Sequence, residues 1–178
     1  MNCGKTGQSA PTTEDRLHIL LGRLVHAFGR FDFNIGLQLK WMGPYCGVKV
    51  EHLLNARMPF TVRLDALEPL VMEIYGHENG EARRDFAQWF EHARTAKAVR
   101  NDFVHGRWAV YSDGFPRTPK IEFIALNWEM EQAKQTPPTS INLDDFEEAI
   151  SALESLFGDY WKLTERYENN AKPSIRQG

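Results

Sequence analysis

Apolar side chains recur at helical spacing through the first half of the chain. Between a cap at Thr13 and about residue 41 they follow the three- and four-residue intervals of an α-helix, which predicts one long helix with a single buried face. Residues 48–56 predict a short helix that stops before Pro59. Residues 61–75 predict another, in which Pro69 either kinks the helix or marks its true start. The stripe of the first helix consists of Leu17, Leu20, Leu21, Leu24, Phe28, Phe31, Ile35 and Leu39.

The second half of the chain predicts two more helices with a change of period between them. Residues 81–105 carry an amphipathic helical pattern that ends before Gly106. The apolar spacing then shortens to that of strands, which predicts a β-hairpin with a long loop over residues 108–126. The polar residues 129–140 contain two prolines and predict a linker. Asn142 is placed to cap a last helix that ends near Tyr167.

These patterns together predict an all-α fold, an up-and-down bundle of four to five helices with a small β-hairpin after the helix at 81–105. A length of 178 residues is enough for one domain with a substantial core. We expect residues 13–168 to form that domain. Residues 1–12, rich in Gly, Ser, Thr and Pro, are expected to be a disordered tail, and residues 169–178 a frayed C-terminus.

Composition and charge limit the classes of function. The net charge of −3 argues against a protein that coats nucleic acid non-specifically, although it leaves room for a local basic site. Two cysteines, Cys3 and Cys46, form neither a disulfide framework nor a metal-ligand spacing, which fits a reducing compartment. No apolar run has the length of a membrane span, and residues 1–13 lack the apolar region of a signal peptide. We therefore expect a cytoplasmic protein without membrane contact.

Three glycines lie in register on a second side of the first helix. Gly22, Gly29 and Gly36 are seven residues apart and roughly 100° or more from the apolar stripe. Each glycine inside a helix costs about 1 kcal/mol relative to alanine. Either another backbone approaches closely along this side, or the glycines occupy a solvated face under no constraint. The sequence leaves both interpretations open.

The chemistry of the chain is concentrated near the end of the helix at 81–105. Arg100 falls near the middle of the apolar stripe, where a guanidinium needs partners or an opening to water. Asn101 and His105 are four residues apart and therefore neighbours on the helix surface, so the amide can fix the imidazole tautomer. Gly106 follows at once and allows the helix to end with the imidazole exposed.

Each of these residues also has a purely structural interpretation. Arg100 would then be paired across a helix seam with a carboxylate, and His105 would be an ordinary helix-end histidine stabilised by the dipole. The carboxylates considered for that pair are Asp32, Glu51 and Glu73. The remaining histidines have no spacing with Cys, Asp or Glu that builds a metal site, so we expect neither a metal nor a cofactor.

The arrangement Arg-Asn-x-x-x-His, formed by Arg100, Asn101 and His105, resembles the signature of the HEPN superfamily. Those proteins are small helical bundles, and many of them are metal-independent ribonucleases that work as dimers. The resemblance is specific over about residues 81–108. It implies an endoribonuclease, as in toxins or defence effectors, in which His105 is the acid or base, Arg100 holds the phosphate and Asn101 orients His105.

Recognition of RNA has weaker support in the sequence. Lys97 and Arg107 add positive charge near the motif, and Trp108 is placed to stack on a base, although core packing is the more common use of such a residue. The resemblance also implies a homodimer, and an antitoxin or other protein is a further candidate partner. Two rivals stay open: a non-catalytic HEPN-like module that binds a nucleotide or a protein, and a purely structural helical dimer.

The helix geometry also makes a prediction about the site. Positions five apart on a helix point roughly 140° away from each other, so Arg100 and His105 of one chain need not converge. Either His105 turns inward as the helix ends, or a two-fold axis brings Arg100 of one chain to His105 of the other. The helix geometry and the family resemblance both favour a cleft shared between two subunits.

Overall fold

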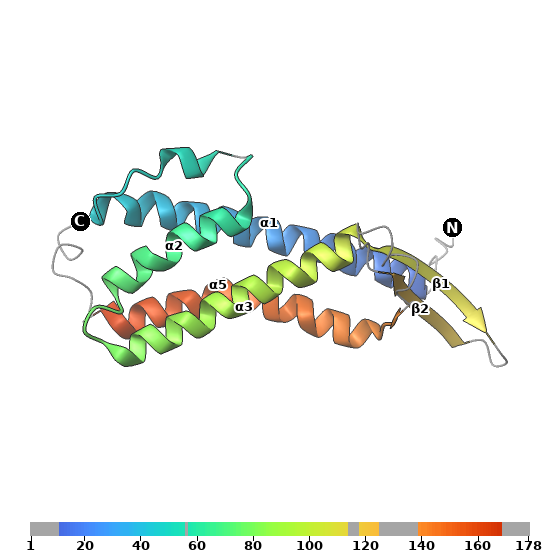
Figure 1. Ribbon diagram of the computed structural model, residues 1–178. Coiled ribbons are helices and arrows are strands. Elements are labelled where there is room, and N and C mark those ends of the chain that lie inside the picture. Colours follow the sequence, from blue (N-terminus) through green and yellow to red (C-terminus); the bar gives the residue numbers. More distant parts are fainter. Residues whose placement is uncertain (1–10, 56, 114–117, 125–138, 169–178) are drawn as a thin grey trace, which may run out of the picture.

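The computed structural model describes residues 11–55, 57–113, 118–124 and 139–168. Within these ranges four α-helices form a bundle, and a small antiparallel sheet stands at one end of it (Figure 1). The prediction of an all-α bundle with a small hairpin is confirmed. The tails expected at 1–12 and 169–178 fall almost wholly outside the described residues, as do the hairpin loop and most of the predicted linker.

The first helix, α1, spans Thr13–Tyr45. Its N-cap is Thr12 and not Thr13 as predicted, because the Thr12 side chain accepts from the Asp15 backbone N–H while the Asp15 carboxylate accepts from the Thr12 backbone N–H. This reciprocal capping box satisfies two donors that a helix start leaves without partners. The predicted apolar stripe is largely buried, with Ile35 and Leu39 fully inside the core.

Two helical elements follow α1 along the chain. A short 3-10 helix, η1 (Glu51–Leu54), stands where a short helix was predicted, and α2 spans Phe60–Ile74. Pro69 lies inside α2 and does not mark its start. The segment that contains η1 runs back alongside α1, so α1 and α2 point in the same direction (Figure 1). Strict alternation of helix direction therefore holds only from α2 onward.

The remaining helices have the predicted bounds within a residue. The motif helix α3 spans Gly80–His105 and is capped by Asn79, whose side chain accepts from two backbone N–H groups. The last helix, α5, spans Leu143–Tyr167 and is capped by Asn142, as predicted. Helix α3 runs antiparallel to α5 and crosses it, which places the C-terminal end of α3 at the same end of the bundle as the start of α5 (Figure 1).

A three-stranded antiparallel sheet follows the motif helix. Strand β1 spans Arg107–Asp113 and pairs with β2, Thr118–Ile124, in a register that opposes Val110 to Ile121. A third strand, β3 (Thr139–Ser140), pairs with β2 and was not predicted. The interpretation of residues 129–140 as linker is therefore wrong for its last two residues. Two residues are too few to produce a period-2 pattern that the sequence could reveal.

Aromatic side chains join the helices in the centre of the core. Trp89 of α3 is 3% exposed and lies in ring contact with Phe31 of α1, Phe90 of α3 and Tyr160 of α5. Its indole N–H donates to the carbonyl oxygen of Leu156 over 2.8 Å, so its one polar atom is satisfied. One side chain thus links three of the four helices.

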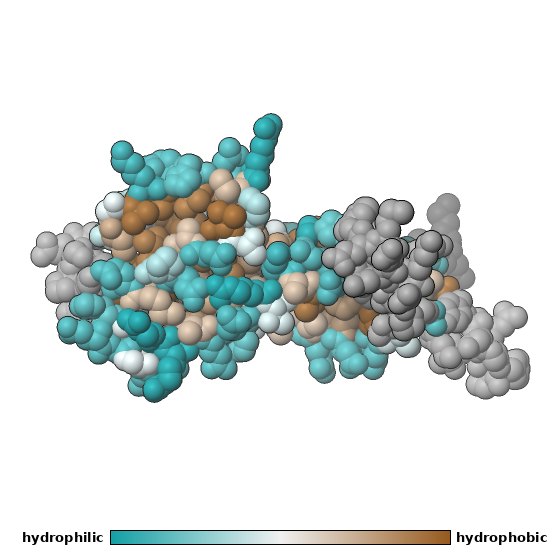
Figure 2. All heavy atoms as spheres, in the orientation of Figure 1, coloured by the Kyte–Doolittle hydropathy of each residue, from teal (hydrophilic) through white to brown (hydrophobic). Residues whose placement is uncertain are grey.

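Apolar side chains also reach the surface. Figure 2 shows apolar surface gathered over α2 and the segment before it. Val48 and Val62, from these two parts of the chain, are 46% and 41% exposed. On α1, Ile19 and Phe33 are more exposed still, at 62% and 65%. Val25, Trp41 and Tyr45 of α1 are exposed as well, at 49%, 48% and 47%.

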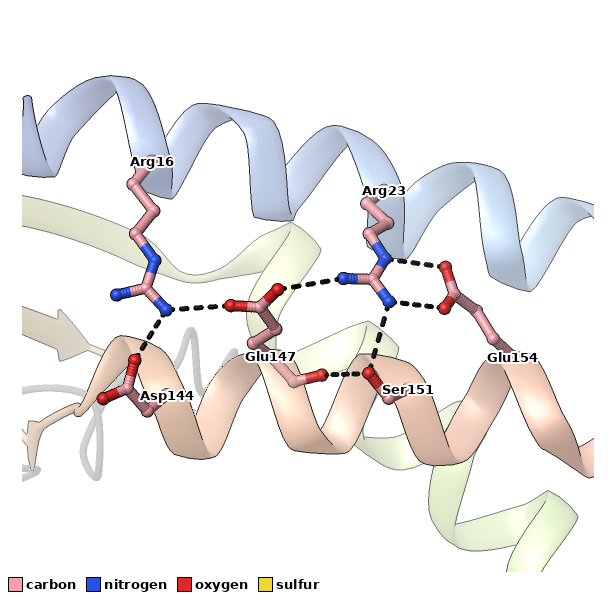
Figure 3. A network of polar contacts seen from close by, with 6 residues as sticks. All are labelled: Arg16, Arg23, Asp144, Glu147, Ser151 and Glu154. Atoms are coloured by element: carbon pink, nitrogen blue, oxygen red, sulfur yellow. Dashed lines mark hydrogen bonds and ion pairs between the residues drawn. The ribbon is translucent and has the colours of Figure 1, made fainter. Parts of the chain in front are cut away.

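An ionic ladder joins the first half of α1 to α5 (Figure 3). Arg23 makes a two-pronged contact with Glu154, with Nε and Nη2 at 2.8 and 2.6 Å from the two carboxylate oxygens. Glu147 lies between the two arginines and accepts from both Arg16 and Arg23. Arg16 also reaches Asp144. The ladder runs in the same order along both helices, so it fixes α1 and α5 in parallel register.

This ladder should make stability depend on pH. The hydrogen bond from Arg23 lowers the pKa of Glu154 below its ordinary value of 4.5. A carboxylate whose pKa is lowered in the folded state contributes stability above the unfolded pKa, and that contribution is lost as the pH falls through the folded value. We therefore expect Arg23→Met to destabilise the fold more at pH 7 than at pH 3 in urea denaturation. Arg84→Met, at an exposed position of α3, is the control; equal losses for Arg23→Met at both pH values would contradict the role of the pair.

Candidate active site

The site lies where α3 ends. His105 is the last helical residue and is exposed, as predicted. Gly106 follows as the C-cap, and its backbone N–H donates to the Asp102 carbonyl oxygen over 2.9 Å. The φ angle of Gly106 is −76°, so the glycine is not required by a left-handed backbone. Strand β1 begins at the next residue, which lets the chain leave the helix axis and opens the last turn to solvent.

The three motif residues converge within one chain. Arg100 Nη1 lies 3.0 Å from Asn101 Oδ1 and 3.3 Å from His105 Nε2. Of the two arrangements that the sequence left open, the structure therefore shows a contact within one chain. The Cβ directions do point apart, but the arginine side chain is long enough to cross the face of the helix and bring its guanidinium to the imidazole. No second subunit is needed for this contact.

The direction of these contacts assigns a role to Asn101 that differs from the predicted one. Its side-chain oxygen accepts from the Arg100 guanidinium and not from His105, so Asn101 fixes the arginine. A guanidinium has only donors. The contact between Arg100 and His105 is therefore a hydrogen bond only when Nε2 carries no proton and offers its lone pair. That is the form in which an imidazole can act as a base.

Residues from α1 hold the rest of the Arg100 side chain. Its guanidinium carbon lies 5.5 Å from the centre of the Phe28 ring, a cation–π distance. Its Nε is buried and has no hydrogen-bond partner among the described residues. Asp32 lies one turn further along α1, and the positive charge of Arg100 acts to lower its pKa. Burial raises the pKa of Asp32, while the charges of Arg63 and Arg100 oppose that rise.

Asp32 is already engaged by a second arginine. Arg63 of α2 donates to Asp32 Oδ2 over 2.6 Å, and the two side chains are only 12% and 28% exposed. The other carboxylate oxygen, Oδ1, is buried without a hydrogen-bond partner among the described residues. The Asp32 carboxylate is thus bound by Arg63, and the positive charge of Arg100 acts on the same carboxylate. A guanidinium beside an exposed imidazole favours an anion at this end of α3.

Sequence reasoning found part of this environment. Asp32 was one of three carboxylates considered as a partner for Arg100, and the charge of Arg100 opposes the rise in the pKa of Asp32 that burial causes. Phe28 and Arg63 were missed as parts of the site. Phe28 was assigned to the apolar stripe, to which it also belongs, and Arg63 lies 31 residues from Asp32 in the chain. No local pattern signals a contact between two helices at that separation.

The residues predicted to contact RNA lie in different surroundings. Lys97 is half-buried on α3, one turn before Asn101. Trp108 in β1 is half-buried, with its ring stacked 5.4 Å from Phe103 and its indole N–H donating to the Phe103 carbonyl oxygen. The ring therefore contributes to the packing of the sheet against the helices. The side chain of Arg107 lies outside the described residues.

A separate groove lies between α3 and α5. Its volume is about 370 Å³, and it contains none of the three motif residues. Leu24 of α1 takes part in its lining, and small residues such as Ala96 and Ala152 belong to its walls. Because these side chains are short, the two helices leave the space between them unfilled. The groove approaches the motif through Val99 but lies on another side of α3.

The described residues contain no group of three or more His, Cys, Asp or Glu side chains placed to hold a metal ion. No helix among them is long and apolar enough to cross a membrane.

The fold and the site together define a class: a helical bundle that carries an arginine, an asparagine and a histidine in mutual contact at the exposed end of one helix. Comparison with protein-family models, with curated proteins and with solved structures gives no significant match. An assignment of function must therefore rest on the geometry of these side chains and on the motif they form.

Proposed function

We propose that this protein is a metal-independent endoribonuclease of the HEPN type. The observation that carries the proposal is the 3.3 Å contact between Arg100 Nη1 and His105 Nε2 at the exposed end of α3. A cation that binds phosphate and a base that accepts a proton are held together there within one chain. The excess of arginine over carboxylate around Asp32 adds to the attraction for a phosphate.

In the proposed reaction the nucleophile belongs to the RNA. The scissile phosphate accepts hydrogen bonds from Arg100. The Arg100 guanidinium then no longer donates to His105 Nε2, whose lone pair becomes free to accept a proton. His105 removes the proton from the adjacent 2′-hydroxyl, whose oxygen attacks phosphorus while the bond to O5′ breaks. O5′ takes up a proton from water, and the His105 imidazolium then gives its proton back to solvent. Arg100 stabilises the extra negative charge of the pentavalent transition state, and Asn101 keeps the guanidinium in place. The products are a 2′,3′-cyclic phosphate and a 5′-hydroxyl.

A second candidate is a non-catalytic HEPN-like module that binds a nucleotide or a protein. The net charge of −3 favours it, because a ribonuclease acting on long RNA gains from a positive surface. The third candidate, a structural dimer in which Arg100 only bridges helices, has support from the proximity of Arg100 to Asp32. A purely structural role for Arg100 does not explain its contact with the exposed His105.

Cleavage of RNA is expected to continue in EDTA. The attacking hydroxyl is supplied by the substrate and the charge of the transition state by Arg100, so the proposed chemistry has no step that needs a metal. The purified chain would be incubated with a mixed-sequence RNA in EDTA, beside the same RNA with 2′-deoxy positions. Cleavage that returns only after Mg²⁺ or Mn²⁺ is added, or that proceeds equally on the deoxy substrate, would contradict the mechanism.

The biological setting follows from the same proposal. A cytoplasmic enzyme of this kind would act as a toxin or defence effector and would need control by an antitoxin or another protein. Family resemblance also implies a homodimer. The contact between Arg100 and His105 within one chain means that dimerisation would serve to position RNA or to control the site, since neither residue has to be supplied by the partner.

A further inference from the structure

The outer face of α1 carries a regular series of residues that the fold leaves uncovered. Eight positions recur at alternating intervals of four and three residues, the spacing of the seam of a coiled coil. All are exposed except Gly36, which is half-buried. From Ile19 onward, large or charged side chains alternate with glycines. The outer face consists of Asp15, Ile19, Gly22, His26, Gly29, Phe33, Gly36 and Lys40.

The described part of the chain leaves this face open at Gly22 and Gly29. A side chain added at Gly22 or Gly29 would meet no other atom within 4 Å, so the close backbone approach that these glycines permit does not occur inside the subunit. At Gly36 the nearest atom would be Arg63 Nη1 at 3.7 Å, an ordinary contact. Ile19 and Phe33, on the same face, are 62% and 65% exposed.

We infer that the outer face of α1 is a two-fold interface at which a second copy of this chain binds in antiparallel orientation. Suppose that the axis passes level with the peptide between Ala27 and Phe28. Each residue of the face is then opposite the residue equally far on the other side of the axis. The facing pairs are Asp15 with the partner's Lys40, Ile19 with the partner's Gly36, Gly22 with the partner's Phe33, and His26 with the partner's Gly29.

Charge and size complementarity identify the occupant and its direction. In this register every large apolar side chain faces a glycine, and the acidic end of the face meets the basic end of its partner. A parallel pair in register would instead place Asp15 on Asp15, Lys40 on Lys40 and Phe33 on Phe33. Like charges would then meet at both ends, and the glycines would leave gaps between the helices.

The area is adequate for a specific dimer. The axis lies close to the middle of Thr13–Tyr45, so the two helices overlap over about 30 residues, or roughly 45 Å at 1.5 Å per residue. A helix about 12 Å across with a third of its surface covered buries roughly 600 Å² per subunit, or roughly 1,200 Å² in total. That figure is at the lower end of specific interfaces, which suits a dimer that dissociates on dilution.

The proposed interface comes close to Arg63 at Gly36 and leaves Arg100 and His105 uncovered. Phe28, on which Arg100 packs, lies next to the axis but roughly 90–130° around the helix from the outer face, as does Asp32. A two-fold axis perpendicular to both helices keeps the two sites on the same side of the dimer. The two Arg100 residues would therefore open toward one side, near the axis. The interface itself is inferred from α1 alone and does not depend on cleavage of RNA.

Sedimentation equilibrium of the full chain tests the inference. We expect a monomer–dimer equilibrium in roughly the micromolar range, with the dissociation constant raised at least about tenfold by Gly22→Leu. The matched control is Gly158→Leu, at an exposed position of α5 outside the outer face of α1, where an added side chain also meets no atom within 4 Å. A chain that stays monomeric up to ~100 µM would overturn the inference, as would equal effects of the two leucines.

A size swap tests the antiparallel register. In the proposed pairing Gly22 faces the partner's Phe33, so the double variant Gly22→Phe and Phe33→Gly exchanges the large and small members of each pair. We expect it to restore dimerisation to within about threefold of the unmodified chain. Circular dichroism would show that each variant is folded. A folded double variant that stays as dissociated as the single variant would overturn the antiparallel arrangement.

Discussion

Arg100→Ala is expected to lower the rate of RNA cleavage by about 10²–10³-fold, the usual effect of removing one donor that stabilises a transition-state oxyanion. Arg100→Lys is not expected to restore it. A lysine is a point charge on a flexible stem, so it cannot donate from one planar group to Asn101, His105 and a phosphate together. Arg84→Ala, an exposed arginine on the same helix, is the control and should leave the rate unchanged.

The corresponding loss for His105→Ala is about 10²–10⁴-fold, since general base catalysis contributes that much. If the two residues act on one phosphate as a unit, the double variant should be little worse than the more damaging single variant. Near-native turnover by Arg100→Lys would mean that Arg100 acts as bulk charge. Strictly multiplicative losses would mean that the two side chains serve separate steps.

Trp89→Ala is expected to produce the largest loss of stability, about 3–5 kcal/mol. The ring joins α1, α3 and α5, and its removal also loses the hydrogen bond from the indole N–H to the Leu156 carbonyl oxygen. A domain of this size has a free energy of unfolding of about 5–15 kcal/mol, so the variant would lose a large part of it. The measurement is urea denaturation followed by circular dichroism.

Trp161 provides the matched control for this experiment. It lies on α5, carries the same side chain and is 43% exposed. Trp161→Ala should cost about 1 kcal/mol or less, as is usual for partly exposed positions. An equal loss in the free energy of unfolding for the two variants would contradict the proposal that Trp89 stabilises the fold by joining three helices.

The helices were predictable because each carries its own local signals. These signals are apolar residues at three- and four-residue intervals, a cap such as Asn142 and a terminating glycine such as Gly106. Each involves only neighbouring residues, so it is visible in the sequence. The contacts between helices have no such signal. The segment with η1 returns alongside α1, so α1 and α2 run in the same direction. This arrangement depends on how the helices pack and not on a local sequence pattern.

The candidate site shows the same division. Arg100, Asn101 and His105 were identified because they share one and a half turns of helix, but their mutual geometry was not. The angular spacing of residues around a helix gives only the directions of their Cβ atoms. It does not show that the long Arg100 side chain crosses the helix surface to reach His105 Nε2. The ion pair of Arg63 with Asp32 joins residues from two helices, so it required the three-dimensional structure.

The glycines of α1 were correctly singled out but left undecided. Their spacing indicated a close approach, and the structure excludes one within the described part of the subunit at Gly22 and Gly29. What the sequence could not provide was the exposure of Ile19 and Phe33 beside them. Only with both observations does the outer face of α1 become a complementary surface, and its test is independent of the catalytic proposal.

Analysis of the product ends tests the central claim most directly. The unmodified chain and His105→Ala would be incubated with a short RNA of defined sequence, and the ends of each fragment would be identified by mass spectrometry. We expect fragments with a 2′,3′-cyclic phosphate and a 5′-hydroxyl from the unmodified chain and none from the variant. Fragments with a 3′-hydroxyl and a 5′-phosphate, or equal cleavage by the His105 variant, would contradict attack by the 2′-hydroxyl with His105 as the base.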